Sequence, residues 1–315
     1  MKKLSKKEFM EIDKWMHLNS RELELTMWNY HFMKGNRRAV LSALTHYQND
    51  DGGFGNMLEP DSWNPNSSPY TTLNAINILK EIVFFDMNHP IYEGIIRFLD
   101  SGIHSSQLGW FFSIPFSGDY PHAPWWTYDE AANSYENIGV TAEIAAFVIG
   151  HLEKNTRLYA KALKYAYMIL KKIFTLSDHG EMGIAGYCIL IDTMQEAGYL
   201  EPSDFDKLSK KISSFVSTSI ELDISKWDTH VIRPSRYIKS PQSDHYKNNK
   251  DIMQIELDYL LDAREHKGVW AIDWSWFDLN EKYPKEFAIS ENWWKGIGAI
   301  QNIMLLKNFD RVDKI

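Results

Sequence analysis

Apolar side chains recur every three or four positions along most of the chain, a period that predicts amphipathic helices. A first helix is expected to begin at Asn19, which together with Glu22 resembles a capping box, and to end at Gly35. The further expected helices cover residues 37–48, 71–79, 90–98, 140–152, 159–173, 184–194, 205–215, 252–261 and 293–306. No segment shows the strict alternation of a strand, so the pattern predicts an all-α fold with little or no sheet.

Two long stretches without helical periodicity, residues 110–137 and 219–248, interrupt this pattern. Long loops inside compact domains are usually functional or mobile. The first stretch is rich in aromatic side chains, namely Trp110, Phe111, Phe112, Phe116, Tyr120, Trp125, Trp126 and Tyr128. We therefore expect it to fold over a part of the protein rather than to act as a solvated linker.

Turns that contain glycine and aromatic residues recur after the helices, at residues 48–55, 107–111, 179–183 and 266–270. Their uneven spacing is compatible with helix-pair units of roughly 50 residues. Such a unit buries both of its faces only when it stacks on its neighbours, and about six pairs would fill the chain. We therefore expect residues 19–315 to form a single domain of about six helical hairpins, preceded by an N-terminal extension over residues 1–18.

The composition and charge of the chain allow two further predictions, one of a cavity and one of the class of partner. The chain has 12 Trp, 16 Tyr and 16 Phe residues, and although a single ring is more often core material, this surplus predicts an aromatic-lined cavity. A net charge of -8 disfavours a nucleic-acid partner. No run approaches the roughly 20 apolar residues of a membrane span, and no apolar signal peptide follows the basic start. We expect a cytoplasmic protein without an integral membrane segment that binds a small, apolar molecule.

The sequence of residues 48–55 is Gln-Asn-Asp-Asp-Gly-Gly-Phe-Gly. It resembles the Gln-x-x-Asp-Gly-Gly-(Phe/Trp)-Gly repeat of the terpenoid cyclase and protein prenyltransferase superfamily, which includes the squalene-hopene cyclases. The matching positions are Gln48, Asp51, Gly52, Gly53, Phe54 and Gly55. The resemblance implies an (α/α)6 toroid in which the glutamine and backbone amides tie the loop to neighbouring helix ends, while the aromatic ring packs between adjacent repeats.

Three other segments extend the resemblance. Residues 268–276, followed by 293–297, look like a weaker second copy of the motif. Residues 47–61 and 122–126 are similar to those of bacterial toroid proteins labelled prenyltransferase-like. For that group the resemblance implies a fold, and it implies no particular reaction.

The acidic motifs of the superfamily's known enzymes are absent from the sequence. Squalene-hopene-type cyclases use Asp-x-Asp-Asp as a proton donor, and class I terpene synthases hold magnesium with Asp-Asp-x-x-Asp. Protein prenyltransferases hold zinc with Asp, Cys and His, but Gly186 stands where the aspartate would precede Cys188. A single cysteine also excludes an internal disulfide. We expect neither a metal nor another cofactor.

Acids and polar groups near aromatic residues remain as candidates for chemistry. Glu59 and Asp61 flank a proline and are a candidate general acid and base, because two carboxyls in different environments can have well-separated pKa values. Alternatively, they cap helix ends or bind backbone amides. His122 is a third catalytic candidate, with a loop anchor as the alternative. Asp273 is the fourth, because a carboxylate among apolar residues needs a partner or a function.

The candidate substrate-binding residues are aromatic, with one arginine that would either pair with Asp273 or clamp an anionic substrate. They are Tyr70, Trp110, Trp125, Trp126, Trp274, Trp276 and Arg233.

Three functions are compatible with these residues. The leading hypothesis is a toroid enzyme that uses acid/base chemistry on an isoprenoid-like substrate in an aromatic-lined central cavity. The second is a carbohydrate-active (α/α) barrel that uses two loop carboxylates. The third is a binding protein that has the same fold and performs no catalysis.

Overall fold

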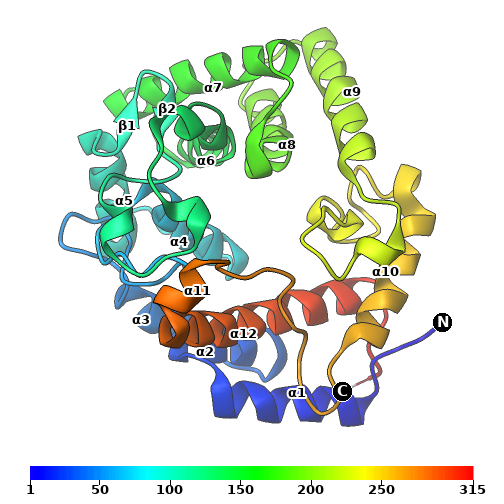
Figure 1. Cartoon of the computed structure of the whole chain (residues 1–315). Coiled ribbons are helices and arrows are strands. Elements are labelled where there is room, and N and C mark those ends of the chain that lie inside the picture. Colours follow the sequence, from blue (N-terminus) through cyan, green and yellow to red (C-terminus); the bar gives the residue numbers. More distant parts are fainter. Residues whose placement is uncertain (315) are drawn as a thin grey trace. The chain divides into compact units, whose positions relative to one another are not determined.

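A computed structural model describes residues 1–314, and it confirms the prediction of an all-α chain (Figure 1). The helices are α1 Lys6–Asn19, α2 Glu22–Phe32, α3 Arg37–Thr45, α4 Pro69–Glu81, α5 Pro90–Ser101, α6 Glu130–His151, α7 Arg157–Thr175, α8 Gly180–Glu196, α9 Pro202–Ser219, α10 Lys250–Ala263, α11 Leu279–Lys282 and α12 Pro284–Asn308. The only sheet within residues 1–314 is a hairpin of β1 Ser105–Ser106 and β2 Gly109–Trp110.

The irregular stretches contain short 3-10 helices. These are η1 Ser117–Asp119, η2 Pro124–Trp126, η3 Ile224–Lys226, η4 Pro234–Arg236 and η5 Lys247–Asn249. The second predicted stretch therefore lacks an α-helix over most of its length, as expected. The first ends earlier than predicted, because α6 already begins at Glu130, with Asp129 as its N-cap. None of the helices in residues 1–314 combines the length and the apolar character needed to cross a membrane.

Two compact units make up the chain. Unit 1 combines Met1–Ala43 with Val216–Ile315, and unit 2 is the continuous segment Leu44–Phe215. The boundaries fall inside α3 and α9, so each of these helices contributes to both units. The single domain and the six-hairpin toroid stay predictions.

Unit 2 consists of successive helix pairs arranged in two rows. In one row α6 contacts both α4 and α8, and in the other row α5 contacts α7 (Figure 1). Helix α6 is apolar around nearly its whole circumference, which suits a helix packed against α4, α7 and α8. This alternation agrees with the helix-pair units that the recurring turns predict.

Two glycines, one in each helix, allow α6 and α8 to approach closely. A Cβ atom at Gly139 of α6 would collide with Met182, and one at Gly186 of α8 would lie 3.0 Å from the Cα atom of Gly139. The two backbones therefore touch where these glycines face each other. This contact fixes the spacing of the two helices.

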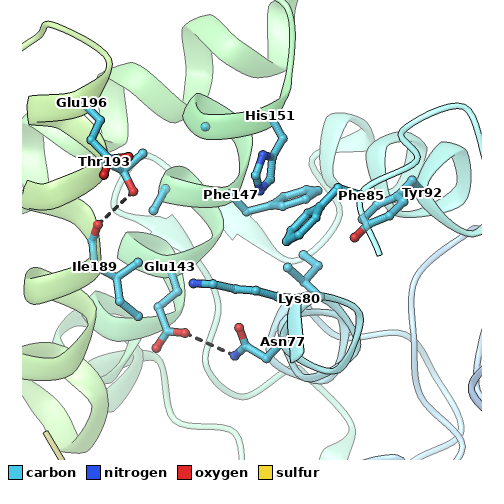
Figure 2. A pocket seen from close by; sticks show the side chains of 13 residues that line it. Asn77, Lys80, Phe85, Tyr92, Glu143, Phe147, His151, Ile189, Thr193 and Glu196 are labelled. Atoms are coloured by element: carbon cyan, nitrogen blue, oxygen red, sulfur yellow. Dashed lines mark hydrogen bonds between the residues drawn. The ribbon is translucent and has the colours of Figure 1, made fainter. Parts of the chain in front are cut away.

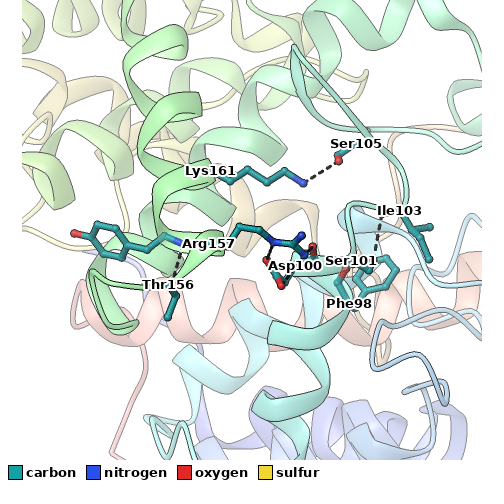
Figure 3. A network of polar contacts seen from close by, with 9 residues as sticks. Phe98, Asp100, Ser101, Ile103, Ser105, Thr156, Arg157 and Lys161 are labelled. Carbon is teal, nitrogen blue, oxygen red and sulfur yellow. Dashed lines mark hydrogen bonds and ion pairs between the residues drawn. The ribbon is translucent and has the colours of Figure 1, made fainter.

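Polar contacts link α5 to α7 at the surface of unit 2 (Figure 3). Arg157 donates to the Asp100 carboxylate at 3.1 and 2.9 Å and to its carbonyl oxygen at 2.9 Å. Lys161 donates to the Ser105 hydroxyl at 2.9 Å. Because the Arg157 side chain is 77% exposed, solvent screens its ion pair with Asp100, and this pair contributes little to stability.

Unit 1 contains a helix that the periodicity did not reveal. Asn19 is the last residue of α1, and α2 begins at Glu22, so the predicted start of the first helix at Asn19 is wrong. The capping box lies at Ser5 and Glu8 instead, where each backbone N–H donates to the other residue's side chain. Residues 6–18, expected to belong to an extension, are therefore helical.

The buried face of α1 packs into the core of unit 1. The Phe9 ring stacks on Trp28 of α2 at 5.3 Å, and Trp28 Nε1 donates to the Asp13 carboxylate at 2.8 Å. Helix α12 contacts both α1 and α2. Leu4 also pairs with the segment around Val312, so residues near both ends of the sequence meet within this unit.

Candidate functional site

The Gln48 turn, residues 48–55, is a structural anchor in unit 2. The Gln48 side chain donates to the carbonyl oxygens of Gly52 at 2.9 Å and of Ile91 at 3.0 Å. Ile91 lies in the first turn of α5, so this contact joins the loop directly to that helix. A tie of this kind is what the resemblance to the terpenoid cyclase superfamily implies for the glutamine.

The other motif residues support the same turn. Asp51 accepts from the Gly53 amide at 2.9 Å and from the Ser67 hydroxyl at 2.7 Å. Phe54 is fully buried, and its amide donates to the Thr72 hydroxyl of α4 at 3.1 Å. Backbone also passes too close to Gly55 for a side chain. All of these contacts stabilise the loop, and none leaves a motif group directed at a ligand.

The second turn, around the β1–β2 hairpin, repeats part of this arrangement. The Trp110 amide donates to the Thr141 hydroxyl of α6 at 3.1 Å, as the Phe54 amide does to Thr72. Trp110 is fully buried, with its ring edge-on to Tyr165 at 5.0 Å. Its position corresponds to the structural ring of the motif, so the geometry favours a packing role over the expected substrate contact.

Glu59, Asp61 and His122 come together in unit 2, where residues 59–63 run antiparallel to residues 121–123. The Ala123 amide donates to the Asp61 carbonyl oxygen at 2.9 Å. Glu59 and Asp61 are only 3% and 1% exposed, and Asn74 of α4 donates to Glu59 at 3.1 Å. This setting fits the alternative in which the acids bind neighbouring polar groups, while their catalytic role stays a prediction.

The His122 ring is held on both sides. Its Nδ1 atom lies 2.6 Å from the Tyr120 carbonyl oxygen, which only accepts, so Nδ1 carries the proton. Its Nε2 atom lies 3.0 Å from the Thr127 hydroxyl. These contacts fit the interpretation of His122 as a loop anchor.

Three rings cluster where the first irregular stretch meets α4. Tyr70 lies edge-on to Trp126 at 4.5 Å and to Phe112 at 5.4 Å, and Phe112 stacks on Trp126 at 4.8 Å. The stretch thus folds back over unit 2, as its aromatic content predicted. Trp125, by contrast, is 36% exposed.

A cavity of about 260 Å³ opens in unit 2 between α4, α6 and α8 (Figure 2). Sequence reasoning missed it, because its lining comes from separate helices and carries no motif. One wall is aromatic: Phe147 lies 5.9 Å from the Tyr92 ring and 5.5 Å from the His151 ring, and Phe85 lies 5.2 Å from His151. Phe85 is 44% exposed at the rim.

The opposite side of this cavity is polar. Asn77 donates to the Glu143 carboxylate at 3.2 Å, and Figure 2 shows Lys80 extending from α4 toward the same side. Within residues 1–314, the charged groups of Lys80 and Glu196 have no hydrogen-bond or ion-pair partner. Packing against its neighbours lowers the pKa of His151, and the positive charge of Lys80 lowers it further.

A more open cavity of about 590 Å³ adjoins the Gln48 turn. Asn49, Asp51 and His104 line it, beside Phe116, which is 76% exposed. Burial lowers the pKa of His104, although the charge of Asp51 opposes this shift. Because Asp51 is already bonded to Gly53 and Ser67, this cavity offers fewer available charges than the one between α4, α6 and α8.

The remaining candidates lie in unit 1. Asp273 lies 3.3 Å from His230 Nδ1 and 3.9 Å from Arg233 Nη2, so the expected pairing with Arg233 is present. Trp274 packs edge-on against Trp294 at 5.2 Å. Trp276 is fully buried, which places it in the core of unit 1.

Neither a metal site in the described residues nor a similar protein of known function indicates what reaction or ligand this chain has. Residues 1–314 contain no group of three or more His, Cys, Asp or Glu side chains placed to hold a metal ion. No family model, no curated protein and no solved structure matches the chain. The cavity between α4, α6 and α8 is therefore the candidate functional site, on the strength of its geometry and charges.

Proposed function

We propose that the chain is a helical-hairpin protein related to the terpenoid cyclase and protein prenyltransferase superfamily, and that unit 2 binds a small apolar amine between α4, α6 and α8. The observation that carries the proposal is the lining of the cavity, in which aromatic rings lie near Glu143 and near Lys80 and Glu196, whose charged groups have no partner within residues 1–314. Pockets that combine apolar walls with a few polar groups are the usual sites for small ligands.

The charge of the cavity favours a cation. Glu143 and Glu196 contribute two formal negative charges, and Lys80 contributes one positive charge. His151 adds no compensating charge near neutral pH, because its pKa is lowered from 6.5. An amine would offset the excess negative charge, whereas a prenyl diphosphate would increase it.

The aromatic wall favours the same ligand. The rings of Phe85 and Phe147 offer faces or edges to the cavity, and a cation held near an aromatic face gains roughly 0.5–2 kcal/mol. An isoprenoid chain would provide the apolar part of such an amine, which would pack against these rings. The cavity volume of about 260 Å³ lies just below the range of drug-sized pockets, so a ligand of modest size is expected.

The proposal is tested with three probes that share one hydrocarbon chain: geranylamine, geraniol and geranyl diphosphate. Isothermal titration calorimetry at pH 7 should give the tightest binding for the amine and the weakest for the diphosphate. Phe147→Ala should weaken the binding of amine and alcohol alike by about tenfold, because both lose the same ring contact. Glu196→Gln should weaken only the amine, by up to about fivefold, because an exposed ion pair is worth about 0–1 kcal/mol.

Glu153→Gln is the matched control, because Glu153 is an exposed acid of unit 2 outside the cavity lining. It should leave all three affinities unchanged. Equal binding of amine and diphosphate would contradict the charge argument, and binding that survives Phe147→Ala would place the site elsewhere. Turnover of geranylamine, followed by NMR, distinguishes an enzyme from a binding protein.

A further inference from the structure

The more open cavity beside the Gln48 turn, of about 590 Å³, has a lining that the contacts of the turn do not explain. Its volume lies in the range of roughly 300–1,000 Å³ that is typical of ligand sites. The acids of its lining are Asp50 and Asp51, and within residues 1–314 no Lys or Arg side chain lines it. The cavity therefore has an excess of negative charge, which attracts a cation and repels an anion.

Asp50 is the acid that the chain leaves most available. Its side chain is exposed, and its carboxylate has no hydrogen-bond or ion-pair partner within residues 1–314. Arg97 of α5 donates to the Asp50 carbonyl oxygen at 3.2 Å, and not to the carboxylate. Asp51 makes both of its bonds within the turn through Oδ1, so its Oδ2 atom remains an acceptor. Both carboxylates therefore keep oxygens that a ligand can use.

Two uncharged side chains of the lining add further acceptors. Asn66 Nδ2 donates to Asn64 Oδ1 at 2.9 Å, while its own Oδ1 atom has no partner within the described residues. Neither ring nitrogen of His104 has a hydrogen-bond partner there. Burial lowers the pKa of His104, so at pH 7 its ring is neutral and presents one acceptor nitrogen. A ligand in this cavity thus meets mainly acceptors, and a group rich in donors matches them.

Phe116 provides an apolar surface in the same lining. Its side chain is 76% exposed, and its φ of 66° places a bulky residue in the left-handed region. Packing does not account for this position, because the ring stays in solvent while the backbone is strained. The ring is therefore available to stack on a ligand.

We propose that this cavity binds a guanidinium group, carried by free arginine or by an arginine side chain of a polypeptide. A guanidinium is planar, permanently charged and has five N–H donors, so its edge matches a carboxylate such as Asp50 and its face matches an exposed ring such as Phe116. An ammonium group has the charge but lacks the flat face and the paired donors. The site shares no lining residue with the cavity between α4, α6 and α8, so it is independent of the function proposed there.

The test compares three probes of similar size by isothermal titration calorimetry on the full chain at pH 7. They are the Nα-acetyl amides of arginine, citrulline and lysine. Citrulline replaces the guanidinium by a neutral urea of the same shape, so the arginine probe should bind about tenfold more tightly. It should also bind several-fold more tightly than the lysine probe, because an ammonium cannot both stack and pair. Equal binding of the arginine and citrulline probes, or no binding of any probe, would overturn the proposal.

Variants separate the contributions of charge and ring. Asp50→Asn should weaken the arginine probe by up to about fivefold and leave the citrulline probe unchanged, because only a charged ligand loses an ion pair. Phe116→Gly should weaken both probes, because both stack on the ring. It should not lower the free energy of unfolding in urea, since glycine adopts a φ of 66° without strain. A loss of stability with unchanged binding would assign Phe116 a structural role and contradict the proposal. Glu153→Gln is the matched control and should change nothing.

Two further probes identify the source of the guanidinium. L-arginine has free amino and carboxyl groups, whereas acetyl-Gly-Arg-Gly amide carries peptide bonds on both sides of the arginine. Tighter binding of L-arginine would identify the free amino acid as the ligand, and tighter binding of the peptide would identify a polypeptide. In both cases the guanidinium is the group that binds. If neither probe bound, the proposal would be wrong.

Discussion

Two turns of unit 2 have the same position in successive helix pairs but differ in how firmly they are held. The Gln48 turn follows α3 and is tied to α5 by buried backbone and amide contacts. The turn at residues 107–110 follows α5 and is tied to α7 by longer side chains, with Lys164 donating to Gln107 at 3.0 Å on the surface. The glycine-rich motif therefore marks the tighter of two equivalent joints.

The common element of the two joints is a hydroxyl on the following helix. Thr72 of α4 accepts from the Phe54 amide, and Thr141 of α6 accepts from the Trp110 amide. In both turns the aromatic ring is fully buried. The helix-pair unit is therefore defined by a buried ring and a threonine, and the glutamine and glycines determine how closely the next pair approaches.

The largest effect is expected from a side chain at Gly52. This glycine has a φ of 92°, and a Cβ atom would collide with the backbone of Gly94 in α5, so Gly52→Ala should cost about 3 kcal/mol or more. Gly109→Ala, at a φ of 131°, would meet the Thr141 side chain and should cost less. Urea unfolding monitored by circular dichroism measures both. Equal losses would show that the two joints are equally tight.

Gly118→Ala provides the control for this pair. Gly118 has no atom within 4 Å of a Cβ position, so its substitution should leave the free energy of unfolding nearly unchanged. A large loss at Gly118 would mean that alanine acts through something other than close packing.

Removing the shared hydroxyls should have the next largest effect. Thr72→Val and Thr141→Val each leave a buried aromatic amide without its acceptor, which costs about 1–3 kcal/mol. The two losses should be similar, because both amides donate at 3.1 Å. The same unfolding measurement tests this, and a loss at only one threonine would break the equivalence of the turns.

The glutamines should differ more than the threonines. Gln48→Ala removes two contacts to backbone carbonyl oxygens and should cost about 1–2 kcal/mol. Gln107→Ala removes one exposed contact to Lys164 and should cost less than about 0.5 kcal/mol. If the two substitutions proved equally mild, the link from Gln48 to α5 would not contribute to stability.

The smallest expected effect is a pH dependence at the third joint, where His179 precedes α8. His179 is 7% exposed, and burial lowers its pKa from 6.5. The folded state then binds fewer protons than the unfolded state, so stability is complete above pH 6.5 and falls as the pH drops below it. His179→Asn, which retains a polar atom near Tyr187, should reduce this slope in urea unfolding at pH 7 and pH 5. An unchanged slope would assign the acid sensitivity to other groups.

Much of the helical architecture was predictable, because helices are encoded locally. The predicted helices within residues 37–306 all have counterparts, and the Gln48 motif indicated a tied turn. The sequence does contain a signal for α1, because Ser5 and Glu8 have the spacing of a capping box. Lysine-rich flanks obscured the apolar face formed by Phe9, Ile12 and Met16.

The candidate site could not be predicted in the same way. The cavity depends on how α4, α6 and α8 pack, and residues such as Lys80, Phe147 and Glu196 have no spacing that links them in the sequence. The burial of Trp110 and Trp276 could not be predicted either. A tryptophan near acids or glycines has the same local sequence in a core as in a binding site. Which of these rings are buried depends on tertiary packing, which the sequence pattern does not reveal.

The discontinuity of unit 1 has a consequence for biosynthesis. A ribosome completes all of unit 2 before it makes α12, the helix against which α1 and α2 pack. At a synthesis rate of roughly 5–20 residues per second, the apolar faces of α1 and α2 remain without α12 for many seconds. We expect nascent chains released before α12 to expose them, and thus to recruit chaperones that full-length chains no longer need.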